Sequence, residues 1–135
     1  TKRRPYFLMS TDTNCLFCNV IDPQVLDQSD TCFAMRDGFP VTTGHTLIIT
    51  KRHVETYFDL TPEERADVQR HIDLERQRLM EDDKTISGFN IGMNCGEDAG
   101  QSIMHCHVHL IPRRKGDIEN PRGGVRGVIP DKRIY

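Results

Sequence analysis

The segment Ile103-Met104-His105-Cys106-His107-Val108-His109-Leu110-Ile111 alternates histidine with apolar residues. In an extended strand, side chains two residues apart lie on the same face. His105, His107 and His109 are therefore expected to share one face, while the residues between them anchor the strand on the core. These are three of the chain's six histidines, and core packing alone rarely places them so regularly. We predict that this strand carries the functional site.

The surrounding segments predict the rest of the fold. Residues 31–37 and 45–50 are apolar and β-branched, which favours strands. A strand is also expected over 89–94, after a glycine. Between them, Thr61-Pro62-Glu63-Glu64 has the hydroxyl, proline and glutamate of a helix N-terminus, and the apolar spacing predicts a helix from about Pro62 to Asp82. Strands on both sides of one main helix indicate an α+β domain with a largely antiparallel sheet.

The composition limits the class of protein. A chain of 135 residues with 36% hydrophobic and 28% charged residues is typical of one soluble globular domain. It has no apolar run long enough to span a membrane. The apolar run after Lys2-Arg3-Arg4 is too short for a signal peptide, so we expect a cytoplasmic protein. The net charge of −2 argues against bulk attraction to nucleic acid, and no specific nucleic acid partner is expected.

Positive charge is nevertheless concentrated in the last quarter of the sequence. The cluster consists of Arg113, Arg114, Lys115, Arg122, Arg126, Lys132 and Arg133. These side chains could form a local surface that binds phosphates, or simply a solvated tail. Composition does not distinguish the two.

Two chemistries fit the histidine strand. Imidazole nitrogens at alternate positions could chelate zinc and leave an open position for water. Alternatively, one imidazole could attack phosphorus while its neighbours orient it. The loop from Asn94 to Ser102 favours the second chemistry. Its glycines allow close backbone approach to an anion, and Gln101 and Ser102 can donate hydrogen bonds to a phosphate.

These motifs together resemble a known family. His105-Cys106-His107-Val108-His109-Leu110-Ile111 matches the His-φ-His-φ-His-φ-φ pattern of the histidine triad (HIT) superfamily of nucleotide hydrolases and transferases, with cysteine as a less typical apolar residue. The segment from Gly44 to Val54 resembles the family's Gly-His-x-Leu-φ-φ-Pro-Lys-x-His motif, with Thr50 in place of proline. The similarity extends from about Cys15 to Pro112. Residues 121–130 resemble the tails of bacterial members related to diadenosine-polyphosphate hydrolases.

The resemblance implies a HIT-like fold and its organisation. We expect a five-stranded, largely antiparallel sheet with one main helix and a short second helix, extended across a homodimer. The expected divisions are a flexible arm over 1–14, the HIT domain over 15–112 and a basic tail over 113–135. The tail would pack on the domain or on the partner subunit, where Arg122 and Arg126 could reach the site.

The resemblance also implies roles for individual residues. His107 would attack the α-phosphate of a purine nucleotide and form a covalent nucleotidyl intermediate, and His109 would assist the leaving group. The implied substrate is a nucleoside phosphoramidate, an aminoacyl adenylate or a dinucleoside polyphosphate, with hydrolysis and transfer both open. The expected substrate-binding residues are Asp37 for the ribose, and Asn94, Gln101 and Ser102 for the phosphates. Asp37 could equally be a turn residue before a glycine.

The pair Cys15-Leu16-Phe17-Cys18 suggests metal or redox chemistry, but it lacks the strand-to-helix setting of redox pairs. In a subset of the resembled family, zinc is held by two cysteines and two histidines. Carried over, the ligands are Cys15, Cys18, His53 and His105, a closed site of the structural kind. The alternative is two buried thiols with His53 at a helix entry.

Two other classes of function remain open on the sequence alone. One is a zinc-dependent hydrolase in which the histidine row itself is the metal site. The other is a non-catalytic nucleotide-binding module. His45 is expected to border the site or end a strand, and His71 to lie at the surface or half-buried on the helix, neither with a catalytic role.

Overall fold

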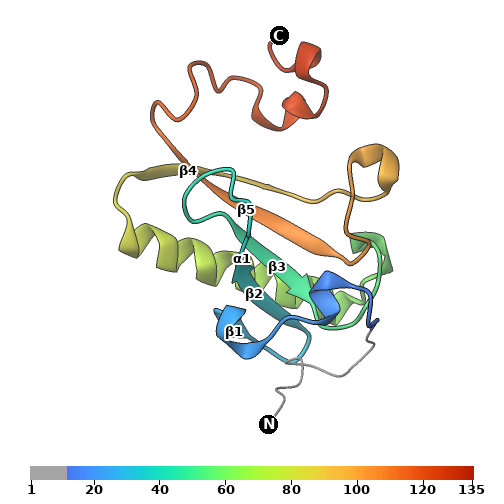
Figure 1. Cartoon of the computed structure of the whole chain (residues 1–135). Coiled ribbons are helices and arrows are strands. Elements are labelled where there is room, and N and C mark those ends of the chain that lie inside the picture. The colour runs from blue at the N-terminus through green and yellow to red at the C-terminus, as the bar shows by residue number, and fades with distance from the viewer. Residues whose placement is uncertain (1–11) are drawn as a thin grey trace.

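The computed structural model describes residues 12–135 and has one sheet with one long helix on it (Figure 1). All strand pairs are antiparallel, and the order across the sheet is β1-β2-β3-β5-β4. The elements are β1 (Asp27–Gln28), β2 (Cys32–Arg36), β3 (Thr46–Thr50), α1 (Pro62–Asp82), β4 (Ile86–Gly92) and β5 (His107–Arg114). The predicted α+β class with a five-stranded antiparallel sheet is confirmed. Most of the predicted N-terminal arm, residues 1–11, lies outside the described residues.

The sheet buries both of its faces, which is why strand alternation matters here. On one face, Ala34, Ile48 and Val108 pack against α1 residues that include Val68. The opposite face is covered by the segment before β1. There, Phe17 and Val20 pack against side chains of β2 and β3, namely Phe33, Leu47 and Ile49. β5 is the fourth strand of the sheet, between the central strand β3 and the edge strand β4.

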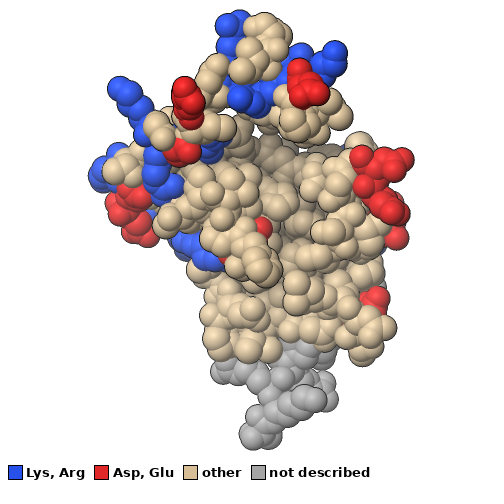
Figure 2. All heavy atoms as spheres, turned by 45° about the horizontal axis from the view of Figure 1, so that its top comes forward, with Lys and Arg blue, Asp and Glu red and all other residues tan. Residues whose placement is uncertain are grey.

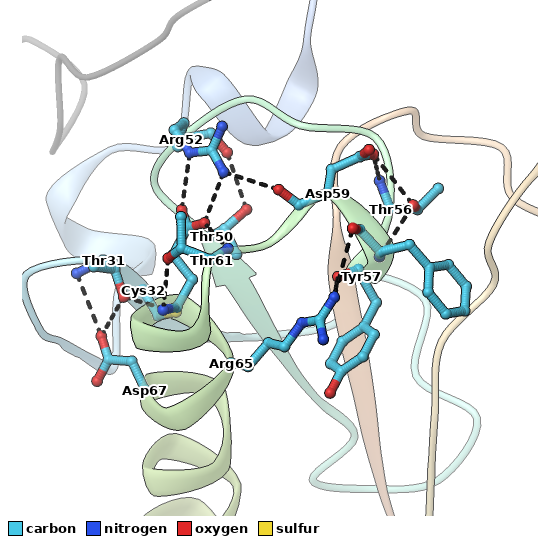
Figure 3. A network of polar contacts seen from close by, with 12 residues as sticks. Thr31, Cys32, Thr50, Arg52, Thr56, Tyr57, Asp59, Thr61, Arg65 and Asp67 are labelled. Carbon is cyan, nitrogen blue, oxygen red and sulfur yellow. Dashed lines mark hydrogen bonds and ion pairs between the residues drawn. The ribbon is translucent and has the colours of Figure 1, made fainter.

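The predicted helix begins and ends as expected. Thr61 is the N-cap of α1: its hydroxyl accepts from the Glu64 N–H at 3.1 Å, and the Glu64 carboxylate accepts from the Thr61 N–H at 2.8 Å. The same carboxylate pairs with Arg52 at 2.7 Å, and Arg52 also donates to the Asp59 carbonyl (Figure 3). This network fixes the turn after β3 to the start of the helix, and that turn carries His53.

The last strand differs from the prediction at both ends. β5 continues through Pro112 to Arg114. This is tolerated because β3 pairs with β5 only as far as Leu110, and the Pro112 carbonyl beyond it accepts from the Thr42 hydroxyl at 2.6 Å. The missing N–H of proline therefore removes no bond from the β3–β5 ladder.

The start of β5 corrects a prediction about the histidines. The strand begins at His107, and the preceding Cys106 N–H bonds to the Val54 carbonyl rather than to a neighbouring strand. His105 thus lies before the strand and is fully buried. The expectation that all three histidines lie in one strand was wrong, because only His107 and His109 belong to it.

A short second helix was also expected; besides α1, the helices within residues 12–135 are all short 3-10 helices. None of the helices within residues 12–135 combines the length and apolar character that crossing a membrane requires.

Gly44 lies two residues before β3 and is held in a conformation that suits only glycine. Its φ is +95°, and an added Cβ would lie 2.9 Å from Leu79 Cδ2 and 3.3 Å from Pro112 Cγ. We expect Gly44→Ala to lower the free energy of unfolding by about 1–3 kcal/mol. Gly38→Ala is the matched control, since Gly38 has no such φ and nothing lies within 4 Å of its added Cβ. Equal stability of the two variants in urea unfolding would contradict this account.

Candidate active site

His107 and His109 lie on the face of the sheet opposite α1. Their ring centroids are 5.2 Å apart, and Phe17 packs against His107 in a T-shaped arrangement with the ring centroids 4.9 Å apart. Both histidines line a cavity of about 390 Å³. Its apolar wall comes from the segment before β1 and from β2 and β3, through residues that include Leu16, Phe17, Val20, Met35 and Leu47.

The backbone fixes the tautomer of His107. Its Nδ1 lies 2.7 Å from the carbonyl oxygen of His105. A carbonyl only accepts, so Nδ1 must carry the hydrogen. The lone pair of the neutral ring is then on Nε2, the nitrogen available for attack on an electrophile.

A chain of hydrogen bonds fixes the opposite tautomer in His109. The Val41 N–H donates to His45 Nδ1 at 3.0 Å, so the hydrogen of His45 is on Nε2. That nitrogen lies 2.9 Å from His109 Nδ1 and donates to it. His109 therefore holds its own hydrogen on Nε2. The two strand histidines present a lone pair and an N–H donor, side by side.

The resting charge of His109 follows from its surroundings. Burial, together with the neighbouring His107 and His45, lowers the pKa of His109 to about 4, although the nearby Asp37 acts in the opposite direction. Burial also lowers the pKa of His45. His109 is thus neutral at pH 7. An anion placed beside it would oppose this shift, because a nearby negative charge favours the protonated ring.

Asp37 follows directly after β2 and also lines the cavity. Its Oδ1 accepts from the Phe39 N–H at 2.8 Å, while its Oδ2 lies 3.4 Å from His45 Nε2. The carboxylate therefore holds the turn and faces the histidines at the same time. Asp37 is therefore both a turn residue, as one interpretation had it, and a residue that lines the cavity.

The loop before the histidines divides into two kinds of residue. Asn94 and Ser102 line the cavity together with the histidines and Asp37. Gln101 is buried: its Oε1 accepts from the Gly96 N–H at 2.8 Å and its Nε2 donates to the Glu55 carbonyl at 2.7 Å. The side chain of Gln101 thus holds the loop in shape rather than facing the cavity.

Cys15, Cys18, His53 and His105 form a second cluster, next to the backbone that leads into His107. His105 Nδ1 is 3.4 Å from Cys15 Sγ, 3.5 Å from Cys18 Sγ and 3.2 Å from His53 Nδ1. Cys18 Sγ is 3.1 Å from His53 Nδ1, and all four donor atoms lie within 4.8 Å of one another. His105 Nε2 is 2.6 Å from the Thr50 carbonyl and so carries the hydrogen, which leaves the Nδ1 lone pair facing the cluster.

The donor set and its spacing fit a tetrahedral zinc ion. Burial raises the pKa of the Cys18 thiol to about 11 and lowers the pKa of His105 to about 4. The pocket therefore disfavours charge on either group alone, whereas a bound cation would stabilise a thiolate. The cluster also touches the first site, because the carbonyl of its ligand His105 sets the tautomer of His107.

This arrangement excludes one expected alternative. His105 faces the cysteines while His107 and His109 face the cavity, and the possible metal-binding groups within residues 12–135 do not join the three rings. A zinc hydrolase built on the histidine row does not fit this geometry.

Two other histidines lie inside the fold. His45, with 2% of its surface exposed, borders the site as expected and bridges the backbone to His109; this positioning role was not predicted, although the Gly44-His45 motif could have indicated it. His71 is also buried rather than at the surface; its Nε2 lies 2.8 Å from the Ser29 hydroxyl, which donates to Asp67. His71 therefore joins α1 to the segment before β2, away from the cavity.

The basic tail is partly neutralised. Arg113 pairs with Asp117 at 2.7 Å, and Arg114 with Asp83 at 2.9 Å. Lysine and arginine still gather over the C-terminal segment, next to a mostly uncharged surface (Figure 2). Only part of the cluster is thus available to a phosphate.

Known proteins share this fold and these motifs. The HIT domain model matches residues 19–116. The Protein hit of Bacillus subtilis is 38% identical over 109 residues, covering 77% of this chain and 74% of its own length. The chain belongs to the HIT family.

Two relatives carry the names of enzymes. The asymmetrical bis(5'-nucleosyl)-tetraphosphatase of Schizosaccharomyces pombe is 42% identical over 78 residues, covering 58% of this chain and 42% of its own length. The bis(5'-adenosyl)-triphosphatase of Dictyostelium discoideum is 35% identical over 100 residues, covering 72% and 64%.

Solved structures agree with the fold. A HIT family protein from Bacillus anthracis superposes with a TM-score of 0.70 at 37% identity, covering 79% of this chain and 78% of that chain. A zinc-bound histidine triad family protein from Mycobacterium smegmatis superposes with a TM-score of 0.70 at 29% identity, covering 79% and 80%.

Proposed function

We propose that this protein is a nucleotidyl hydrolase or transferase that cleaves a purine nucleotide at its α-phosphate. The observation that carries the proposal is the pair of fixed tautomers in one cavity, a free lone pair on His107 Nε2 and an N–H on His109 Nε2. The two relatives named as dinucleoside polyphosphate hydrolases support it. The substrate class is a nucleoside phosphoramidate or a dinucleoside polyphosphate.

In the proposed first step, His107 Nε2 forms a bond to the α-phosphorus as the bond from phosphorus to the leaving group breaks. The Nε2–H of His109 donates a hydrogen bond to the departing atom, which takes its proton from water. In the second step, water or another acceptor attacks the same phosphorus and its proton passes to solvent. The bond from phosphorus to His107 Nε2 breaks, which frees His107 and releases the nucleotidyl product.

The remaining residues have binding and positioning roles in this proposal. The apolar wall of the cavity holds the base, and Asp37 accepts from the ribose hydroxyls. Asn94 and Ser102 contact the phosphate, while Gln101 keeps the loop in place. His45 is a positioning residue, since it acts on the substrate only through His109.

We also propose that zinc occupies the site of Cys15, Cys18, His53 and His105, with a structural role. The zinc-bound relative supports this, as does the spacing of the donor atoms. Zinc would hold the segment before β1 on the sheet and fix the carbonyl that orients His107. A cytoplasmic location and a homodimer complete the proposal, and a monomeric mass in sedimentation at micromolar concentration would remove the dimer.

Removing the bridge to His109 should affect poor leaving groups most. His45→Leu deletes the donor that fixes the His109 tautomer, so we expect kcat to fall about 10–100-fold for a phosphoramidate. For a nucleotide ester of an acidic phenol, which departs without a proton, kcat should change about threefold or less. His45→Gln, which keeps an N–H donor, should recover part of the loss. An equal loss on both substrates would contradict the role of His45.

The experiment that tests the proposed function is a substrate panel. Adenosine phosphoramidate and diadenosine polyphosphates of different lengths are incubated with the protein, and the products are identified. We expect AMP to be released from at least one class, with no release by the His107→Asn variant. If the wild-type protein released no nucleoside monophosphate from any of them, the proposal would fail.

A further inference from the structure

The turn that carries the two cysteines also forms part of the cavity in which the proposed function places the nucleotide. Cys15 and Cys18 supply two of the four donor atoms of the proposed zinc site, and the 3-10 helix η1 (Leu16–Cys18) joins them. Leu16 and Phe17, the residues between the cysteines, line the cavity of about 390 Å³. One turn of the chain therefore has its thiols in one site and its apolar side chains in the other.

The loop before β5 contributes to both sites in the same way. Ser102 and Ile103 line the cavity, and His105, a third donor of the zinc site, follows two residues later. His105 Nδ1 lies 3.4 Å from Cys15 Sγ and 3.5 Å from Cys18 Sγ. The zinc site therefore joins two segments that both line the nucleotide cavity.

The turn contacts the sheet through its side chains. Two backbone hydrogen bonds within it are local: the Cys15 N–H donates to the Asp12 carbonyl at 3.0 Å, and the Asn19 N–H donates to the Leu16 carbonyl at 3.3 Å. Phe17 packs against β2 and β3, and the thiols meet His105. A zinc ion bound to the thiols and to His105 would therefore fix the position of the turn on the sheet.

Asn19 connects the two sites directly. Its Nδ2 donates to the Cys15 carbonyl at 2.6 Å and to the Asp12 carbonyl at 3.1 Å, which closes the loop that carries a zinc ligand. The same side chain lines the nucleotide cavity. A nucleotide in the cavity would thus contact the residue that holds Cys15 in place.

Both ligands favour the same position of the turn. Zinc needs both thiols beside His105, and the base needs Leu16 and Phe17 against the sheet. A ligand shifts a conformational equilibrium towards the state that it binds, so each should assist the other.

We infer that zinc and the nucleotide bind with positive coupling through the turn from Cys15 to Cys18, and that Asn19 is a positioning residue that transmits this coupling. The inference rests on the proposed function and on the proposed zinc site. It adds to them that the metal controls the affinity for the nucleotide. The coupling is reciprocal: zinc must raise the affinity for AMP by the same factor as AMP raises the affinity for zinc.

The test measures this factor in both directions. The affinity for AMP is compared between zinc-loaded protein and protein from which a chelator has removed the metal, with circular dichroism to establish that both are folded. Zinc should raise the affinity for AMP about tenfold, which is typical of coupling between two sites. In the reverse direction, the release of zinc from the folded, loaded protein to a fluorescent chelator should be slower with saturating AMP than without it. Ribose 5-phosphate, which has a phosphate but no base to contact the turn, should not slow the release.

Two amide side chains of the same cavity provide a matched pair of variants. Asn19 and Gln24 both line the cavity, but the Gln24 side chain accepts from the Ile21 N–H at 3.3 Å, outside the turn between the cysteines. Asn19→Ala should reduce the coupling factor to about threefold or less, and Gln24→Ala should keep the wild-type factor. A merely structural role of Asn19 would weaken both affinities and leave the factor unchanged.

The outcomes separate the inference from the proposals on which it rests. Equal affinity for AMP with and without zinc in folded protein would overturn the inference and leave the proposed function in place. Equal coupling factors in Asn19→Ala and Gln24→Ala would overturn the role of Asn19. Wild-type protein that bound AMP in neither state would overturn the inference together with the proposed function, and protein that bound no zinc would overturn it together with the zinc proposal.

Discussion

Replacing His107 with asparagine is expected to lower turnover by at least about 10⁴-fold, because nucleophilic attack and positioning fail together. Asparagine can still donate to the His105 carbonyl, which accepts from His107 Nδ1 at 2.7 Å, but it offers no nucleophilic nitrogen. The substitution removes the reacting atom while leaving the cavity largely intact. Turnover is followed by the release of nucleoside monophosphate.

Binding measurements separate this loss of chemistry from a loss of the site. The affinity of the His107→Asn variant for AMP should stay within about threefold of the wild-type value, because the apolar wall and Asp37 are unchanged. Turnover within tenfold of the wild type would show that His107 is not the nucleophile. Loss of AMP binding in parallel with turnover would show that the substitution had damaged the cavity.

The second large effect is expected at the cluster of Cys15, Cys18, His53 and His105. The purified protein should contain one zinc ion per chain, and Cys18→Ser should remove it. We expect this variant to lose about 3–5 kcal/mol of stability, seen as a fall of roughly 10 °C in Tm. The proposed ion would join the segment before β1 to the turn after β3 and to His105, so its loss would release parts of the chain that are distant in sequence.

Cys95→Ser is the matched control, since Cys95 lies outside the cluster of four donor atoms. Its zinc content and Tm should equal those of the wild type. Because the proposed role of zinc is structural, folded Cys18→Ser protein at low temperature should still react through His107, although more slowly. Wild-type protein without zinc, together with equal Tm values for the two variants, would contradict the zinc proposal.

The helix α1 and the strands β2 and β3 could be predicted from the sequence, because residues within each element determine where it begins and ends. The capping residues of α1 located the helix from Pro62 to Asp82, as observed. β-branched residues located β2 and β3 to within a residue or two. The start of β5 could not be read in this way, because it depends on where the neighbouring strand stops. Alternation alone therefore placed His105 in the strand, whereas it lies before it.

The site was predictable as far as motifs specify single residues. His107, His109, Asp37, Asn94 and Ser102 lie around one cavity. The bridge from His45 to His109 joins residues 64 positions apart, and its direction depends on a bond from the Val41 N–H. A neighbouring cavity that His109 shares with Val125 and Val128 likewise requires the C-terminal segment to fold back over β4 and β5. Such contacts depend on the whole fold and leave no local pattern.

The most direct test of this account is to trap the proposed intermediate. Wild-type protein is mixed with a substrate labelled in its α-phosphate, quenched within milliseconds and digested under neutral or alkaline conditions. The account predicts an acid-labile nucleotidyl group on the peptide that contains His107, forming and decaying at rates consistent with turnover, and none in the His107→Asn variant. Turnover by the wild-type protein with no label on this peptide at any time point would contradict it.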